Sequence, residues 1–91
     1  MTISSIYALH IYVDAKRIKA LRKRLDWTQP EMAAYLGLSG GVVISHWENN
    51  VNPPRGLSVR FLRLLELMSD AELEKTKKSL RRIHAETFED D

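Results

Sequence analysis

Residues 28–48 read TQPEMAAYLGLSGGVVISHWE, and this stretch decides the fold. Thr28 and Glu31 form a capping box: the Thr28 hydroxyl accepts a backbone N–H of the first helical turn, and the Glu31 carboxylate reaches back to the Thr28 N–H. The helix that starts here is expected to run to Leu36, because Gly37 can adopt the left-handed conformation in which helices end.

A second helix is predicted over VVISHWEN, residues 42–49. It ends in consecutive asparagines, a residue type that tolerates the left-handed conformation. Ile44 and Trp47 lie on one face and can anchor it to the first helix, where the small side chain of Ala33 allows a close crossing. The other face is left free. Two helices related in this way form a helix-turn-helix, whose second helix fits the major groove of DNA.

Amphipathic patterns predict three further helices. One covers residues 15–25 behind an N-cap at Asp14, and another starts at residue 57 or 58 and ends at Met68. A second capping box, formed by Ser69 and Glu72, opens a last, highly charged helix. Its thin apolar stripe is typical of a docking or dimer surface rather than of a central core, and its end is expected to be frayed. The stripe consists of Leu73, Leu80, Ile83 and Phe88, and the frayed residues are 86–91.

These elements predict one all-α domain of five helices. Residues 5–13, SIYALHIYV, are rich in β-branched and aromatic types, which is typical of a short strand; an N-terminal extension of the following helix is the alternative. The expected organisation is an N-terminal arm or strand over 1–13, which can contact a second subunit, and a helix-turn-helix domain over 14–68. A C-terminal amphipathic helix with its tail follows over 69–91.

The composition excludes several classes. The 91 residues include no cysteine, so neither disulfides nor a thiolate zinc site can stabilise so small a core, and oligomerisation is the common route that remains. No apolar run reaches the roughly 18 residues that span a bilayer, and the N-terminus lacks a secretory signal; we therefore expect a cytoplasmic protein without a membrane partner. Residues 1–68 carry nine Lys and Arg against five Asp and Glu, while residues 69–91 carry five against seven. The first part therefore favours an anionic partner.

No catalytic, metal or cofactor site is indicated. His10, His46 and His84 are far apart in the chain, and no pair has the spacing of metal ligands. Ser45 and His46 are adjacent on a helix, so their side chains diverge and cannot act as nucleophile and base. No glycine-rich nucleotide loop is present. Neither an enzyme nor a cofactor is expected.

The motif resembles that of bacterial and phage regulators of the Cro/Xre helix-turn-helix type. Between residues 16 and 66 the matching residues are Leu21-Arg22, Trp27-Thr28-Gln29, Met32-Ala33, Leu36-Gly37-Leu38-Ser39, Ile44-Ser45, Trp47-Glu48-Asn49 and Pro54. The resemblance implies a lambda-repressor-like fold of five helices and sequence-specific binding to double-stranded DNA. It also implies an ion pair between Arg22 and Glu48 that supports the orientation of the second helix.

The turn is one residue longer than is common in that family, with Gly40 and Gly41 in the added space. In this respect it is similar to the DNA-binding domain of MqsA-type antitoxins. The similarity continues after the motif, where the matching residues are Pro54, Ser58, Leu62, Arg63 and Leu65. The zinc-binding half of such antitoxins has no counterpart here, since there is no cysteine, which puts a toxin-binding role in doubt but not DNA binding.

The free face of the second helix consists of Val42, Ser45, His46 and Asn49. Val42 can contact a thymine methyl group and His46 a guanine edge, and together with Ser45 they are the expected base contacts. For Val42 and Val43, packing into the core is the alternative.

Contacts to the DNA backbone are expected around this helix. The resemblance implies that Gln29 lies against a phosphate with Thr28 nearby, which agrees with the exposed N–H groups at a helix start. The full set of expected backbone contacts is Thr28, Gln29, Ser39, Asn49, Asn50 and Arg55. The lysines Lys16, Lys19 and Lys23 share one face of the first helix, which is either a phosphate track or a solvated surface.

The sequence therefore predicts a sequence-specific transcriptional regulator. A protein that binds both halves of a palindromic operator needs twofold symmetry. A homodimeric repressor, or autorepressor, of a bacterial or phage operon is therefore expected. The alternative is an antitoxin or another protein-binding module, in which the apolar N-terminal segment and the last helix bind a toxin or another protein partner.

Overall fold

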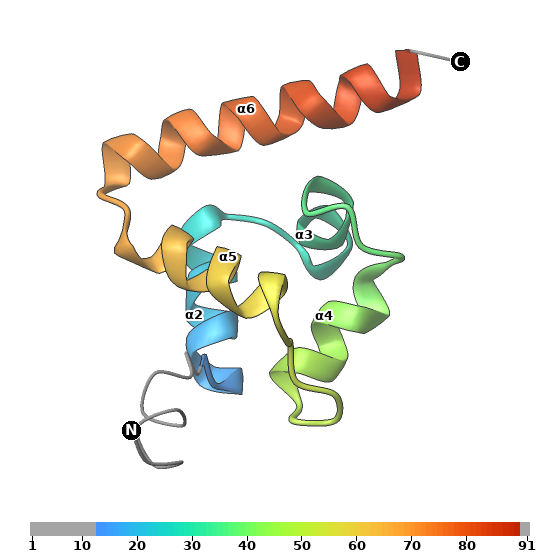
Figure 1. The fold of residues 1–91 in the computed structure, drawn as a ribbon, viewed down its shortest axis with the longest axis vertical. Helices are drawn as coiled ribbons and strands as arrows, with labels where there is room; N and C mark the ends of the chain where they lie inside the picture. The colour runs from blue at the N-terminus through green and yellow to red at the C-terminus, as the bar shows by residue number, and fades with distance from the viewer. Residues whose placement is uncertain (1–12, 90–91) are drawn as a thin grey trace, which may run out of the picture.

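The computed structural model describes residues 13–89, which form five α-helices (Figure 1). In chain order these are α2, Ala15–Leu25; α3, Gln29–Tyr35; α4, Gly41–Glu48; α5, Leu57–Leu67; and α6, Asp70–Glu89. Residues 13–89 contain no strand, so this part of the chain is all-helical, as predicted. The strand predicted over 5–13 lies outside the described residues except for Val13, which is buried and not in a strand.

Both predicted capping boxes are present. The Thr28 hydroxyl accepts the Glu31 N–H at 3.2 Å, and the Thr28 N–H donates to Glu31 Oε1 at 2.8 Å. The same reciprocal pair joins Ser69 and Glu72 at 3.2 and 2.8 Å. Each box provides partners for backbone donors that a helix start otherwise leaves unpaired, and so fixes where α3 and α6 begin.

Left-handed residues end three helices. Gly37 (φ 74) turns the chain out of α3, and Asn50 (φ 58) follows α4, both as predicted. Asp26 (φ 59) ends α2, and its N–H donates to Lys23 O at 3.0 Å. This last turn was not predicted, because aspartate adopts the left-handed region less readily than glycine.

Several predicted boundaries are wrong. Helix α3 ends at Tyr35 and α5 at Leu67, each one residue before the predicted end. Helix α4 covers Gly41–Glu48, one residue earlier at each end than predicted. Helix α6 continues to Glu89, although fraying was expected from residue 86. Bonds across its last turns stabilise it: Arg82 Nε donates to Glu86 at 3.2 Å, and the Thr87 hydroxyl donates to the Ile83 carbonyl at 2.9 Å.

All five helices contribute to one core. Its six fully buried large side chains are Ile18, Leu25, Met32, Ile44, Leu62 and Leu65. Helix α6 closes this core with Leu73, which is 3% exposed, and Leu80 packs against it, whereas Ile83 is 56% exposed. The prediction that the apolar stripe of α6 lies outside the central core is therefore wrong for Leu73. Burial of one leucine contributes about 1.5–3 kcal/mol, which explains why the charged helix docks.

Helix α6 lies along one side of the molecule and α4 on the opposite side (Figure 1). The beginning of α6 is tied to α2 by Arg24, whose Nη2 donates to the Met68 carbonyl at 2.7 Å and to Asp70 at 2.9 Å. Lys77 is buried with its ammonium group 3.7 Å from Glu74. None of the helices in residues 13–89 is long and apolar enough to cross a membrane.

Candidate nucleic-acid interface

The start of α4 lies directly on the first turn of α3. A Cβ atom at Gly41 would lie 3.1 Å from the Pro30 nitrogen and 3.2 Å from its Cα, so only glycine fits this crossing without a shift. The predicted site of close approach, Ala33, is also buried. The contact at Gly41 is not evident from the sequence pattern, because it depends on how the two helices cross. The arrangement places the starts of the two motif helices side by side.

The predicted ion pair between Arg22 and Glu48 is present. Arg22 Nε and Nη2 donate to the two carboxylate oxygens at 2.6 and 3.0 Å, and Nη1 donates to the Trp27 carbonyl at 3.1 Å. The side chains are 14% and 4% exposed, and hydrogen bonding to Glu48 raises the pKa of Arg22 above its ordinary value. This forked contact joins α2 to α4 and fixes the orientation of α4.

Gln29 belongs to the same network. It is half-buried, and its Nε2 donates to Glu48 Oε1 at 3.3 Å. Thr28, its neighbour, is exposed with its hydroxyl in the capping box. Gln29 is predicted only as a phosphate contact. Its bond to Glu48 could not be predicted, because it depends on how α3 and α4 cross.

The outer face of α4 carries the predicted base contacts. Val42 is 62% exposed, and Ser45 and His46 are half-buried. Asn49 is exposed at the end of the helix, and its Nδ2 donates to the Ser45 carbonyl at 2.7 Å and to Ser45 Oγ at 3.3 Å. Val43 packs against the core, so the core alternative holds for Val43 and not for Val42.

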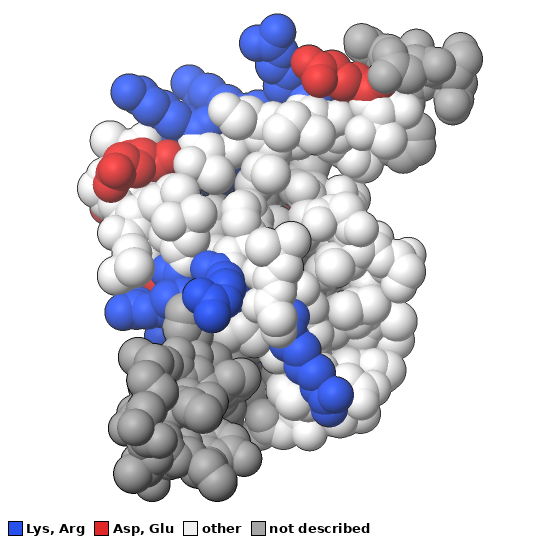
Figure 2. Space-filling view, viewed as in Figure 1, with Lys and Arg blue, Asp and Glu red and all other residues white. Residues whose placement is uncertain are grey.

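The other predicted backbone contacts lie around this face and are exposed. Ser39 is in the turn before α4, whereas Asn50 and Arg55 are in the loop that follows it. The lysines Lys16, Lys19 and Lys23 are exposed on α2. On the face seen in Figure 2, basic side chains lie over α6, around α2 and α5, and on the loop between α4 and α5, while α3 and α4 show none. Of these groups of basic side chains, the one on the loop that follows α4 is next to it in the chain, whereas α4 itself contains no lysine or arginine.

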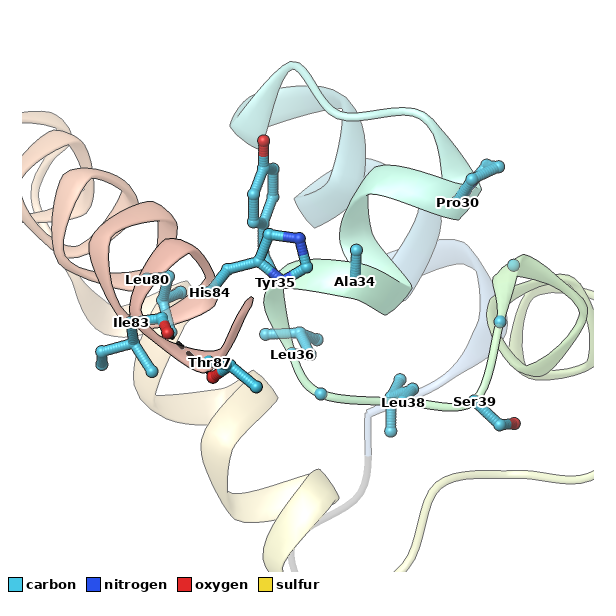
Figure 3. Close-up of a pocket in the computed structure, with 13 residues that line it drawn as sticks. Pro30, Ala34, Tyr35, Leu36, Leu38, Ser39, Leu80, Ile83, His84 and Thr87 are labelled. Carbon is cyan, nitrogen blue, oxygen red and sulfur yellow. Dashed lines mark hydrogen bonds between the residues drawn. The ribbon is translucent and has the colours of Figure 1, made fainter. Parts of the chain in front are cut away.

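A separate pocket of about 600 Å³ lies between α6 and the turn that joins α3 to α4 (Figure 3). Tyr35 and His84 meet edge to face in its wall with ring centres 5.4 Å apart. The pocket adjoins a second of about 270 Å³, and the shared wall consists of Leu36, Leu38 and Leu80. Together they form an apolar groove bounded by α5 and α6.

The described residues hold no group of three or more His, Asp or Glu side chains that could bind a metal ion. Comparison of the chain with models of protein families, with curated proteins and with solved structures finds no match.

Proposed function

We propose that the protein is a sequence-specific DNA-binding transcriptional regulator of the Cro/Xre helix-turn-helix type. The observation that carries the proposal is the uncovered outer face of α4, which lies beside the capped start of α3 and is held by the Arg22–Glu48 pair. A helix whose inner side is fixed to the rest of the domain and whose outer face is uncovered is suited to insertion into a major groove.

In the proposed complex, α4 lies in the major groove and its outer face reads base edges. Val42, Ser45 and His46 contact bases. The DNA backbone is contacted by Thr28, Gln29, Ser39, Asn49, Asn50 and Arg55. We propose a fold of the lambda-repressor-like type. The longer turn, with Gly40 and Gly41, supports a resemblance to MqsA-type antitoxins.

The regulator acts as a homodimer on a palindromic operator, in the cytoplasm where the operon is transcribed. A twofold dimer doubles the contacts and matches the symmetry of two half-sites about 34–36 Å apart. We propose repression, including autorepression, of a bacterial or phage operon, and no catalytic activity.

The test is binding of the full chain, followed by fluorescence anisotropy, to the DNA upstream of its own gene and to a scrambled duplex of the same length. Measurements at two salt concentrations separate the phosphate contribution from the sequence-specific one. Tighter binding to the native duplex at both concentrations supports the proposal, and equal, strongly salt-sensitive binding to both contradicts it.

A second candidate is a protein-binding module such as an antitoxin, which the apolar groove between α5 and α6 favours. Leu57 on one side is 83% exposed, and Ile83 on the other side is also exposed. If this candidate is correct, the product of a neighbouring gene co-purifies with the wild-type chain and not with an Ile83→Lys variant, whose charge would face the groove.

A further inference from the structure

Val42 is one of several exposed large apolar residues in the part of the chain that the structure describes, and it lies on the outer face of α4. It is the second residue of α4 and is 62% exposed, whereas the next two residues, Val43 and Ile44, pack inward. Valine is also a weaker helix former than alanine or the unbranched polar residues. Neither packing within the chain nor helix propensity therefore explains a valine here.

Gly40, two residues earlier, is likewise unexplained by the fold. Its backbone (φ 169, ψ 172) is extended, which any residue adopts, and an added Cβ atom would meet nothing within 4 Å. It occupies the N-cap of α4, where serine, threonine, aspartate and asparagine are preferred, and α4 has no side-chain cap. By contrast, the positive φ of Gly37 and the short distance between Pro30 and a Cβ atom at position 41 favour glycine at those two positions.

Beside Val42, the outer face of α4 carries the polar side chains of Ser45, His46 and Asn49. The amide of Asn49 already donates to Ser45, which leaves few groups to read bases by hydrogen bonds. No arginine or lysine occurs in α4, so the strong bidentate contacts that read guanine are missing from this helix. Among the four bases, thymine is distinguished in the major groove by its C5-methyl group, which an apolar side chain contacts.

We propose that Val42 recognises the C5-methyl group of a pyrimidine in the major groove, and that Gly40 has no side chain because the DNA comes close to it. This inference rests on the proposed function and names the base feature that the motif reads. The first residues of a recognition helix are the ones that reach base edges, and Val42 lies in that turn. A serine at position 40 would cap α4 but would fill the space beside the DNA.

The first experiment selects a tightly bound duplex from a random pool with the full chain, and then replaces each thymine in turn by deoxyuridine, which lacks only the methyl group. At one thymine of each half-site we expect wild-type affinity to fall about fourfold, as for the loss of one buried methyl group. Val42→Ala, whose shorter side chain has less contact with the methyl group, is expected to show a smaller loss of affinity. The inference is overturned if replacing thymine by deoxyuridine lowers the affinity at no position. It is also overturned if the replacement lowers the affinity of the wild type and of Val42→Ala equally.

A cytosine pair and a 5-methylcytosine pair at that position identify the source of the methyl group. A gain for 5-methylcytosine in the wild type alone means that the methyl group is read on either base. If 5-methylcytosine gives no gain in affinity but replacement of thymine by uracil still lowers it, the contact is to thymine. Thermal unfolding of Val42→Ala serves as the control, because an exposed alanine leaves the stability of α4 unchanged or raises it.

Gly40→Ser tests whether the DNA comes so close to position 40 that no side chain fits there. We expect its thermal midpoint to equal or exceed that of the wild type, and its affinity for the selected duplex to fall at least about tenfold, as for the loss of one good base contact. Unchanged affinity overturns the role of Gly40. Failure to select any duplex contradicts the proposed function itself, whereas specific binding without a uracil effect contradicts only the inference about Val42.

Discussion

Arg22 and Glu48 form a two-pronged ion pair from α2 to α4, with Nε–Oε2 at 2.6 Å and Nη2–Oε1 at 3.0 Å. Both side chains are largely removed from solvent. The Glu48 carboxylate also accepts Gln29 Nε2, so a single acidic group connects α2, α3 and α4. The loss of either partner would leave an unpaired charge in the middle of the motif.

We expect Arg22→Met to lower the free energy of unfolding by about 3–5 kcal/mol, because it leaves the Glu48 carboxylate buried and unpaired. The double variant Arg22→Met/Glu48→Leu should lose less, since no buried charge remains. Urea unfolding of the full cycle measures both values. Arg82→Met is the control, because it breaks the exposed Arg82–Glu86 pair and should cost less than about 1 kcal/mol. A double variant that is less stable than Arg22→Met would contradict the argument.

Gly37→Ala is expected to destabilise the protein by about 1–2 kcal/mol, because an alanine at φ 74 is strained although space for its Cβ exists. Gly40→Ala is the matched control, only three residues away but extended and equally uncrowded. It should be neutral or stabilising by up to about 1 kcal/mol, since it restricts the unfolded chain. Thermal unfolding compares the two variants, and equal losses would refute the assignment of strain to Gly37.

Gly41→Ala is expected to cost about 1–3 kcal/mol for a different reason, namely overpacking against Pro30. Two of the three nearest atoms belong to the Pro30 backbone, at 3.1 and 3.2 Å, so they cannot move aside as a side chain would. The added substitution Pro30→Ala removes only the ring contact and should therefore restore little of the loss. Full recovery in that double variant, measured by urea unfolding, would show that the ring alone limits the crossing.

Both capping boxes are expected to make stability depend on pH in the acidic range. Hydrogen bonding to the Thr28 backbone, and then to its hydroxyl, lowers the pKa of Glu31 below 4.5, and Ser69 does the same for Glu72. The unfolded chain therefore binds protons at these carboxyls more readily than the folded chain. Their contribution is present above pH 4.5 and is lost as the pH falls through the lowered values.

Urea unfolding between neutral and strongly acidic pH measures this dependence, and it should be weaker in Glu31→Gln and Glu72→Gln. NMR titration provides a site-specific check: Thr28→Ala should raise the pKa of Glu31 part of the way, because the backbone donor remains. A pKa that stays where it is in Thr28→Ala would mean that the hydroxyl has no part in the shift.

DNA binding should respond differently to changes on α4 and in the loop that follows it. His46→Ala should weaken binding to the specific duplex by about 1–3 kcal/mol and leave a scrambled duplex unaffected, as expected for a lost base contact. Arg55→Gln should weaken both duplexes alike and reduce the slope of log affinity against log salt by about one, as expected for a lost phosphate contact. Anisotropy titrations at several salt concentrations distinguish the two patterns. The same response in both variants would argue against a division between base and phosphate contacts.

Much of the helical framework follows from local relations in the chain. Thr28 with Glu31, and Ser69 with Glu72, are three residues apart, so their reciprocal bonds form as soon as the backbone turns into a helix. Gly37 is one of the few residues that turn out of a helix without strain. The Arg22–Glu48 pair was predicted from the family resemblance of the motif rather than from spacing, since 26 residues separate the two.

Tertiary packing decides what such local patterns leave open. The charged composition of α6 does not reveal that Leu73 reaches the central core, because its depth depends on where the helix docks on α3. The crossing of α3 and α4 likewise brings Gly41 against Pro30 and Gln29 within hydrogen-bond distance of Glu48. It also leaves Val42 exposed, whereas Val43 packs against the core. Hydrogen bonds within one helical turn are set by neighbours in the sequence, whereas the burial of a side chain is set by segments that meet only after the helices pack together.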